Sequence, residues 1–159
     1  MKVHIETDIN ASADKVWKIL AHDFVDVAHW SSIVKESRII SRGDLPADAV
    51  LADQAPVIGR ATKTRAGEFY EYFTEFSDEK KEFTFEGANM PRMMISATNN
   101  SKIITKGDNS CVVSFDVTMQ FKGIFKIFSP LIERRVSRSF GRVQRDLKTF
   151  AEMDKPVIS

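Results

Sequence analysis

Residues 111–150, "CVVSFDVTMQFKGIFKIFSPLIERRVSRSFGRVQRDLKTF", decide the fold. The first eleven residues alternate between apolar and polar, which predicts an extended strand. One face of that strand carries Cys111, Val113, Phe115, Val117, Met119 and Phe121. Gly123 ends the strand, and residues 124–153 have a helical pattern. A strand followed at once by a long helix predicts a sheet that packs against a C-terminal helix.

The predicted helix has two distinct faces. Its apolar residues recur with a period near 3.6 and form one stripe: Ile132, Val136, Phe140, Val143, Leu147 and Phe150. Four arginines lie roughly opposite: Arg134, Arg138, Arg142 and Arg145. We interpret them as a solvated outer face, with a docking patch for an acidic partner or a membrane as the alternative. Ser129-Pro130 is an N-cap and first-turn pair that kinks or restarts the helix.

The residues before this stretch predict an antiparallel sheet. "VHIETDI" (3–9) alternates as a half-buried strand, and "KESRIIS" (35–41) predicts a second one. After a long polar loop at 42–56, several strands are joined by the tight turns "RAGE", "SDEK" and "KGDNS". We expect residues 93–106 to form one long strand with a bulge at Asn99-Asn100. The order of elements predicts the α+β class.

Short helices are expected directly after the first strand. Ser12 is the predicted N-cap of a helix over "ADKVWKILA", which buries Val16, Ile19 and Leu20. A sheet of six or seven twisted strands curls, and a single long helix cannot fill the curl completely. The space that remains is either filled by Phe and Met side chains or kept as a cavity. Twelve phenylalanines suit both outcomes.

Composition excludes several classes of protein. The 159 residues are the length of one domain, spanning 1–159. Lys plus Arg (23) nearly balance Asp plus Glu (22), which gives no overall drive toward nucleic acid or an anionic membrane. Cys111 is the only cysteine, so disulfides and cysteine-based zinc sites are excluded. With no signal peptide and no apolar run long enough to span a membrane, we expect a cytoplasmic, bacterial protein whose oligomeric state the sequence leaves open.

The stretch "HDFVDVAHWSS" (22–32) contains residue types that suit chemistry. His22 and His29 are seven residues apart and would share a face of a continuous helix, but no strong metal motif accompanies them. Ser31 and Ser32 lie in no nucleophile motif. We therefore expect no catalytic residue, no metal and no cofactor here. The stretch is predicted to be a short-helix cover over a pocket, with Trp30 as a wall residue or as ordinary core.

The same residues carry a family resemblance. "INASADKVWKIL" followed by "DFVDVAHWSSIVKES" resembles the START-related (SRPBCC) superfamily, in its polyketide cyclase/dehydrase-like branch. Asp23-Phe24 and Trp30 match that pattern, whereas Ser31 stands where the family usually has proline. The strand pair within 57–86 and the final "LKTFAE" also fit. The resemblance implies a helix-grip fold: a curved antiparallel sheet of six to seven strands around the long C-terminal helix, with two short helices after the first strand.

Alternation and the resemblance together select candidate pocket residues. In "FYEYFTEF" (69–76), Glu71 and Glu75 are expected to face solvent, with Tyr70, Tyr72, Thr74 and Phe76 pointing inward. Aromatic and methionine side chains suit an adaptable apolar site. The predicted ligand-binding residues are Phe24, Trp30, Tyr70, Tyr72, Phe83, Phe85, Met93, Phe115, Val117, Met119 and Phe140.

The expected function is the binding of an apolar small molecule, such as a lipid, a quinone or a polyketide-like compound, without obligatory catalysis. One alternative is a cyclase or dehydratase that uses the same cavity. That alternative needs an acid or base near the pocket, and the alternation leaves few. A second alternative is a START-related module that binds a protein partner. No nucleic acid and no membrane span are expected.

Overall fold

A computed structural model describes residues 1–153 and shows seven antiparallel strands in one curved sheet. The spatial order is β1-β7-β6-β5-β4-β3-β2. The strands are β1 (Lys2–Ile9), β2 (Glu36–Ile39), β3 (Gly59–Thr64), β4 (Gly67–Ser77), β5 (Glu82–Ala88), β6 (Met94–Gly107) and β7 (Ser110–Phe121). The predicted helix-grip fold is confirmed.

The helices follow β1 and β7. A first group consists of α1 (Ala13–Trp17), a π-helical turn (Lys18–His22), a 3-10 turn (Phe24–Asp26) and α2 (Val27–Trp30). Ser12 caps α1 as predicted, because its side chain accepts a hydrogen bond from the Lys15 backbone N–H at 3.1 Å. A 3-10 segment η4 (Gly123–Phe128) then leads into the long helix α3 (Ser129–Met153), so the helix restarts at Ser129.

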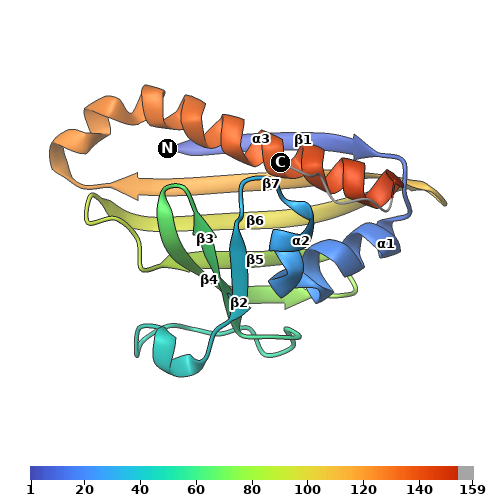
Figure 1. Ribbon diagram of the computed structural model, residues 1–159, viewed down its shortest axis with the longest axis horizontal. Coiled ribbons are helices and arrows are strands. Elements are labelled where there is room, and N and C mark those ends of the chain that lie inside the picture. The colour runs from blue at the N-terminus through green and yellow to red at the C-terminus, as the bar shows by residue number, and fades with distance from the viewer. Residues whose placement is uncertain (154–159) are drawn as a thin grey trace.

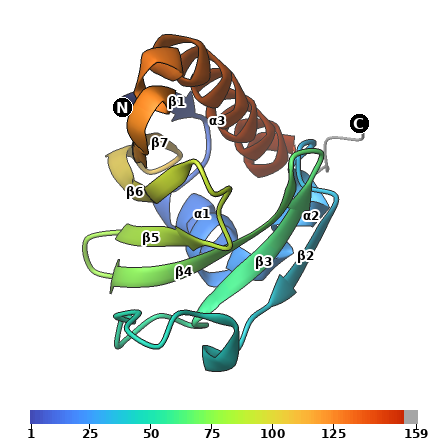
Figure 2. The ribbon, with the colours of Figure 1, turned by 90° about the vertical axis from the view of Figure 1, so that its left-hand side faces the viewer.

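The single long helix covers only part of the sheet. Figure 1 shows α3 lying across β1 and β7, while α1 and α2 sit below it in the right-hand half of the view. Figure 2, turned by 90°, shows α1 and α2 enclosed by the curl of the sheet, with the loop after β2 on the outer side. Helices therefore cover the concave face of the sheet at two places. The middle strands of the sheet lie between α3 and the pair α1 and α2.

Gln144 attaches α3 to the sheet. Its side chain is fully buried, and its Nε2 donates hydrogen bonds to the backbone oxygens of Ile5 (3.0 Å) and Val113 (3.3 Å). Its Oε1 accepts a hydrogen bond from the Thr7 hydroxyl at 2.7 Å. The amide thus connects the helix to β1 and β7, and a buried polar group that is satisfied in this way fixes one orientation of the helix.

The main core lies between α1, α2 and the concave face. Phe73, Phe76 and Phe83 form a contiguous group of rings there, with centroids 5.2–6.4 Å apart. Phe24 joins this group, 4.3 Å from Phe73. The ring of Trp17 packs against it, 5.3 Å from Phe76. Much of the phenylalanine content is therefore used for packing at this end of the molecule.

One sequence-based prediction about the sheet was wrong in detail. The bulge is not at Asn99-Asn100, because these residues pair in register with Val117 and Asp116. In β6 the register shifts instead near the two ends of the strand, and another shift occurs in β4 between Phe73 and Glu75.

The predicted loop at 42–56 is present, and it is more than a polar connection between β2 and β3. It begins with a capped 3-10 turn (Arg42–Asp44), and it buries Leu45 in a cluster with Tyr72 on the outer face of the sheet.

We predict that replacing Gln144 by Met destabilises the fold by about 1–3 kcal/mol, because the Thr7 hydroxyl and two backbone oxygens lose their partner. Arg145→Met is the matched control, since Arg145 is the exposed neighbour on the same helix and should change stability by less than about 0.5 kcal/mol. Urea unfolding of both variants measures the difference. Equal stability of the two variants would show that Gln144 does not anchor α3.

Candidate functional site

A cavity of about 780 Å³ lies between the concave face of the sheet, α2 and α3. Its apolar wall includes Phe24, Val27, Trp30, Phe69, Phe83, Phe85, Met94, Phe115, Val117, Met119, Phe140 and Val143. The volume lies within the usual range of about 300–1,000 Å³ for small-molecule sites. The space left by one helix on a curled sheet is thus not entirely filled by side chains.

The cavity reaches the surface between α3 and two loops. Its lining includes Arg65 and Ala66 at the β3–β4 turn, Pro91 in the β5–β6 loop, and Ser139 and Arg142 on α3, all of which are exposed. In Figure 1 the tip of the β3–β4 hairpin rises toward α3 on the near side of the sheet. We refer to these five residues as the mouth of the cavity.

Nine of the eleven residues predicted to bind a ligand line the cavity: Phe24, Trp30, Tyr70, Phe83, Phe85, Phe115, Val117, Met119 and Phe140. Their role in binding remains a prediction. Tyr70 contributes to the wall, but its ring also packs in the outer cluster with Tyr72 and lies 5.6 Å from the guanidinium of Arg38. The Tyr70 side chain therefore does not point squarely into the cavity, although the alternation of the strand had predicted that it would.

Tyr72 does not line the cavity, contrary to the prediction. It packs on the outer face of the sheet with Ile40 and Leu45, and its hydroxyl donates a hydrogen bond to Glu86 at 2.8 Å. The register shift in β4 explains the error, because it changes which residues of the strand face inward. After the shift Phe76 packs in the core as expected, whereas before it Glu71 faces the cavity in place of Tyr72.

Met93 is also outside the cavity, and its neighbour Met94 lines the wall instead. The Met93 side chain is exposed, and its carbonyl accepts a hydrogen bond from the Lys122 backbone N–H at 2.9 Å. β6 begins only at Met94 and shifts register directly afterward. Alternation at the end of a strand, next to a bulge, is a poor guide to which side chain points inward.

An ion pair is the most polar feature of the wall. Arg60 Nε lies 2.6 Å from Glu71 Oε2, and the two side chains are 11% and 20% exposed. Arg60 also donates a hydrogen bond from Nη1 to the Phe24 backbone oxygen at 2.6 Å, and its guanidinium stacks 3.7 Å from the centroid of the Phe24 ring. These contacts fix the pair in place at the edge of an apolar site, where a charge interacts with a ligand more strongly than in water.

Two buried polar groups of the wall have no hydrogen-bond partner within residues 1–153: the Trp30 indole N–H and the Asn99 Oδ1. Both residues are at most 3% exposed. The Asn99 amide nitrogen does donate to the Ser101 hydroxyl at 3.1 Å. An unsatisfied buried polar group costs about 1–3 kcal/mol, so a ligand that supplied a partner would gain affinity.

Four polar residues that the sequence pattern did not predict also belong to the wall: Arg60, Glu71, Asn99 and Ser101. For Asn99 and Ser101 a signal was present: they alternate with Ala97 and Ile103 on one face of β6. Polar residues in the middle of an inward-facing strand pattern indicate a space that is not ordinary core. For Glu71 no such signal existed, since the shift that turns it inward is not visible in the sequence.

The stretch 22–32 is chiefly structural. His22 Nε2 and the Trp17 indole nitrogen both lie 2.6 Å from Asp78 Oδ1. The Trp17 N–H is the main cause that lowers the pKa of Asp78, and His22 adds to the effect. His29 packs edge-on against Phe150. In the part of the chain that the structure describes, no three His, Cys, Asp or Glu side chains are arranged to hold a metal ion.

Ser32 connects this stretch to α3. Its backbone N–H and its hydroxyl both donate to Asp146 Oδ2 at 2.7 Å, and Asp146 is 6% exposed. Ser32, Val27 and Trp30 all line the cavity. The segment after α1 therefore forms one wall of the cavity and is held against the long helix by a charged hydrogen bond.

Fold and cavity together define a START-like protein with a hydrophobic ligand-binding fold. Residues 1–152 match the family described as "Polyketide cyclase / dehydrase and lipid transport", and the chain belongs to that family. No curated protein matches the sequence. Within residues 1–153 no helix is long and apolar enough to cross a membrane.

Solved structures share the fold at low sequence identity. A START superfamily protein from Mycobacterium smegmatis superposes with a TM-score of 0.75 at 11% identity, over 97% of this chain and 99% of that one. Norcoclaurine synthase from Thalictrum flavum gives 0.65 at 17%, over 94% and 92%. The di-domain ARO/CYC protein BexL gives 0.73 at 10%, over 93% of this chain and 45% of that one. At these identities the likeness concerns the fold.

We predict that a ligand in the cavity changes the fluorescence of Trp30 and leaves that of Trp17 nearly unchanged. Trp30 lines the cavity with an unpaired indole N–H, whereas the indole of Trp17 is bound to Asp78. Trp17→Phe and Trp30→Phe each leave a single reporter. Trp30→Phe should also weaken binding by roughly 0.5–2 kcal/mol, through lost area and the lost N–H. A ligand response carried by Trp17 alone would place the binding site elsewhere.

We predict that Tyr72 ionises far later than an ordinary tyrosine. Burial, and then its hydrogen bond to Glu86, raise the pKa of Tyr72 from 10.0 to about 12. Because the folded pKa is above the unfolded one, this group stabilises the fold below pH 10 and loses that contribution as the pH rises toward 12. Absorbance titration of tyrosinate should show a late fraction that Tyr72→Phe removes. A wild-type curve without a late fraction would contradict the prediction.

Proposed function

We propose that this protein binds a small molecule with a large apolar body and a few polar groups, and holds it in the cavity between the sheet and α3. The single observation that supports this most directly is the cavity itself, about 780 Å³ with a largely aromatic and aliphatic wall. A domain of this size could have filled such a space with larger side chains, since protein interiors are normally close-packed. An open space of this volume favours an occupant.

The polar groups of the wall indicate which ligands fit. The Trp30 N–H can donate to a carbonyl or hydroxyl oxygen, and the Asn99 amide oxygen can accept from a hydroxyl. The Arg60–Glu71 pair adds a charged position in the same wall. A pure hydrocarbon would leave the Trp30 N–H and the Asn99 amide oxygen without partners. Hydroxylated or carbonyl-bearing compounds, such as quinones, polyketide-like molecules or lipids with a small polar end, satisfy them better.

The comparisons support this class of ligand. The family description names polyketide cyclases and dehydrases together with lipid transport, and one solved relative in fold is a norcoclaurine synthase mutant in complex with a transition-state analogue. Lipids, which the family description names, have large apolar bodies.

A blocking variant tests the proposal. Ala97 lines the cavity, and Ala97→Trp should fill part of it, whereas Ser96→Trp places the same ring on the neighbouring residue outside the lining. With the neutral probe N-phenyl-1-naphthylamine, we expect fluorescence enhancement in wild type and Ser96→Trp and at least about a tenfold loss of affinity in Ala97→Trp. Equal probe binding by all three folded proteins would contradict the proposal. Native mass spectrometry of freshly purified wild type can then identify a bound compound.

A cyclase- or dehydratase-type enzyme is the second candidate, and one observation favours it. Glu71, expected at the surface, lies instead in the cavity wall beside Arg60. A carboxylate in an apolar, partly enclosed site is a suitable group for moving a proton, provided that a substrate atom comes within about 3 Å. In that case the cavity would bind the substrate and Glu71 would exchange the proton.

Glu71→Gln separates the two candidates. The amide keeps the shape of the side chain and removes the exchangeable charge. If the protein only binds, a compound identified by native mass spectrometry should be recovered chemically unchanged from wild type and from the variant. If the protein is an enzyme, wild type should convert it, for example with loss of water, and Glu71→Gln should not. Glu36→Gln, on an exposed pair with Lys63, is the control for loss of a surface carboxylate.

A further inference from the structure

Five large apolar side chains are exposed together where β7 passes into α3. Nine of the ten residues from Lys122 to Leu131 are exposed. Ile124, Ile127 and Leu131 are 69%, 76% and 68% exposed. We refer to the group Ile124, Phe125, Ile127, Phe128 and Leu131 as the apolar tip. Single exposed apolar residues are common, but five within eight positions form a patch that a water-soluble surface rarely leaves uncovered.

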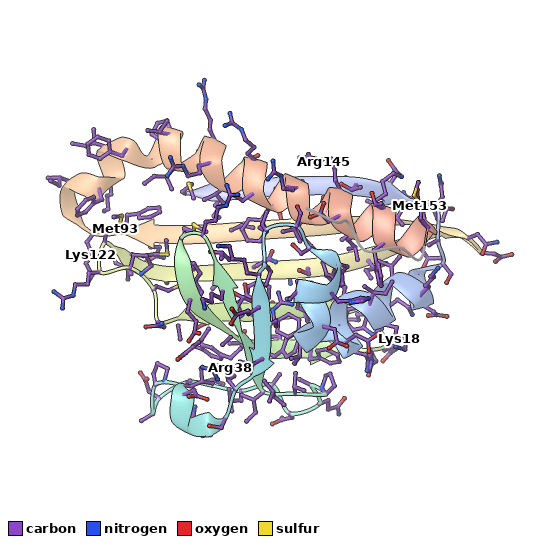
Figure 3. The ribbon with its side chains drawn as sticks, in the orientation of Figure 1. Lys18, Arg38, Met93, Lys122, Arg145 and Met153 are labelled. Atoms are coloured by element: carbon purple, nitrogen blue, oxygen red, sulfur yellow. The ribbon has the colours of Figure 1, made fainter. Side chains whose placement is uncertain are left out.

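The adjoining start of β6 enlarges this surface. Met93 is 39% exposed, and its carbonyl accepts a hydrogen bond from the Lys122 backbone N–H at 2.9 Å. Figure 3 shows Met93 and Lys122 together at the end of the molecule where β7 runs into α3, with the Lys122 side chain directed away from the body. The apolar tip is therefore at one extremity of the protein, with nothing of residues 1–153 beyond it to cover it.

The charge around the apolar tip is strongly positive. Between residues 122 and 145 there are seven basic side chains and one acidic one, Glu133. Lys122 and Lys126 are within the segment, and Arg134, Arg135 and Arg138 follow it on exposed positions of α3. The rest of the chain compensates, since the whole protein carries a net charge of only +1. This local excess is a specific feature of one end of the molecule.

We propose that the apolar tip docks on an anionic lipid bilayer, inserting its apolar side chains at the headgroup boundary while the flanking lysines and arginines contact acidic headgroups. Short segments with apolar side chains and basic flanks lie in the interface in this way, without spanning the membrane. A second copy of this chain is a poorer occupant, because its identical cluster of positive charge would oppose the contact. A bilayer supplies both the apolar phase and the complementary charge.

The position of the apolar tip relative to the cavity supports a bilayer as the occupant. Ser139 and Arg142, two residues of the mouth, are on the same helix as Leu131. Ser139 is eight positions after Leu131, which is about 12 Å along a helix at 1.5 Å per residue. The mouth also carries Arg65 and Arg142, so the positive surface continues to it. Docking would bring the mouth close to the membrane, where an apolar ligand could enter from the lipid phase.

Vesicle flotation tests the docking, and it does not depend on whether the cavity binds a ligand. Wild-type protein should float with vesicles of equal parts phosphatidylcholine and phosphatidylglycerol, and much less with phosphatidylcholine alone. The double variant Ile127→Ser, Leu131→Ser should reduce the partition coefficient by at least about tenfold. The matched control is Ile39→Ser, Val50→Ser, which removes side chains that are 59% and 74% exposed elsewhere and should bind as wild type does.

Two further experiments test the role of charge in the docking and the self-association of the protein. Lys122→Glu, Lys126→Glu should abolish the preference for phosphatidylglycerol while leaving the thermal unfolding midpoint unchanged. Flotation of all variants to the same extent as wild type would overturn the proposal. So would a dimer in analytical ultracentrifugation that Ile127→Ser, Leu131→Ser dissociates, because the apolar tip would then be covered by a second copy. Probe binding in the cavity without any vesicle binding would refute the docking and leave the proposed function standing.

Discussion

The attachment of α3 to one side of the sheet is the constraint on which the rest of the structure depends. The buried amide of Gln144 binds backbone oxygens of Ile5 and Val113 and the Thr7 hydroxyl, so the helix is fixed on β1 and β7. One helix so placed cannot also cover β3 to β6, because a seven-stranded twisted sheet is wider than a helix and curls away from it. A second cover is needed, and α1 and α2 provide it at one end only.

The cavity follows from this incomplete cover, and its walls are held by polar contacts rather than by apolar packing alone. Asp146, two residues beyond Gln144, accepts two hydrogen bonds from Ser32 and so holds the α2 wall against α3. Arg60 connects β3 to Glu71 on β4 and to the Phe24 carbonyl before α2. These contacts fix the segments of the wall at defined positions. The cavity between these segments carries the proposed binding function, and the apolar tip, in η4 and the first turn of α3, carries the proposed docking function.

The sequence predicted the fold well, because β7, α3 and the Ser12 cap have clear periodic and local signals. It also placed most of the apolar wall correctly, since Phe115, Val117 and Met119 alternate without interruption on β7. The prediction of which side chains face inward failed where the register between strands changes. The bulge in β4 reverses which side chains face inward, so Tyr72 was predicted inside and Glu71 outside. A bulge arises from pairing with neighbouring strands, which a single strand's pattern does not contain.

Methyl NMR of protein labelled at the methionine methyl groups tests the central claim most directly, that the cavity admits an apolar ligand. Met90, Met94 and Met119 line the cavity, whereas Met93 and Met153 are exposed outside it and act as internal controls. Titration with N-phenyl-1-naphthylamine should shift the first three signals, with saturation, and leave the other two in place. Saturable shifts at Met93 or Met153, with Met94 and Met119 unmoved, would contradict the account, because the ligand would then bind on the surface.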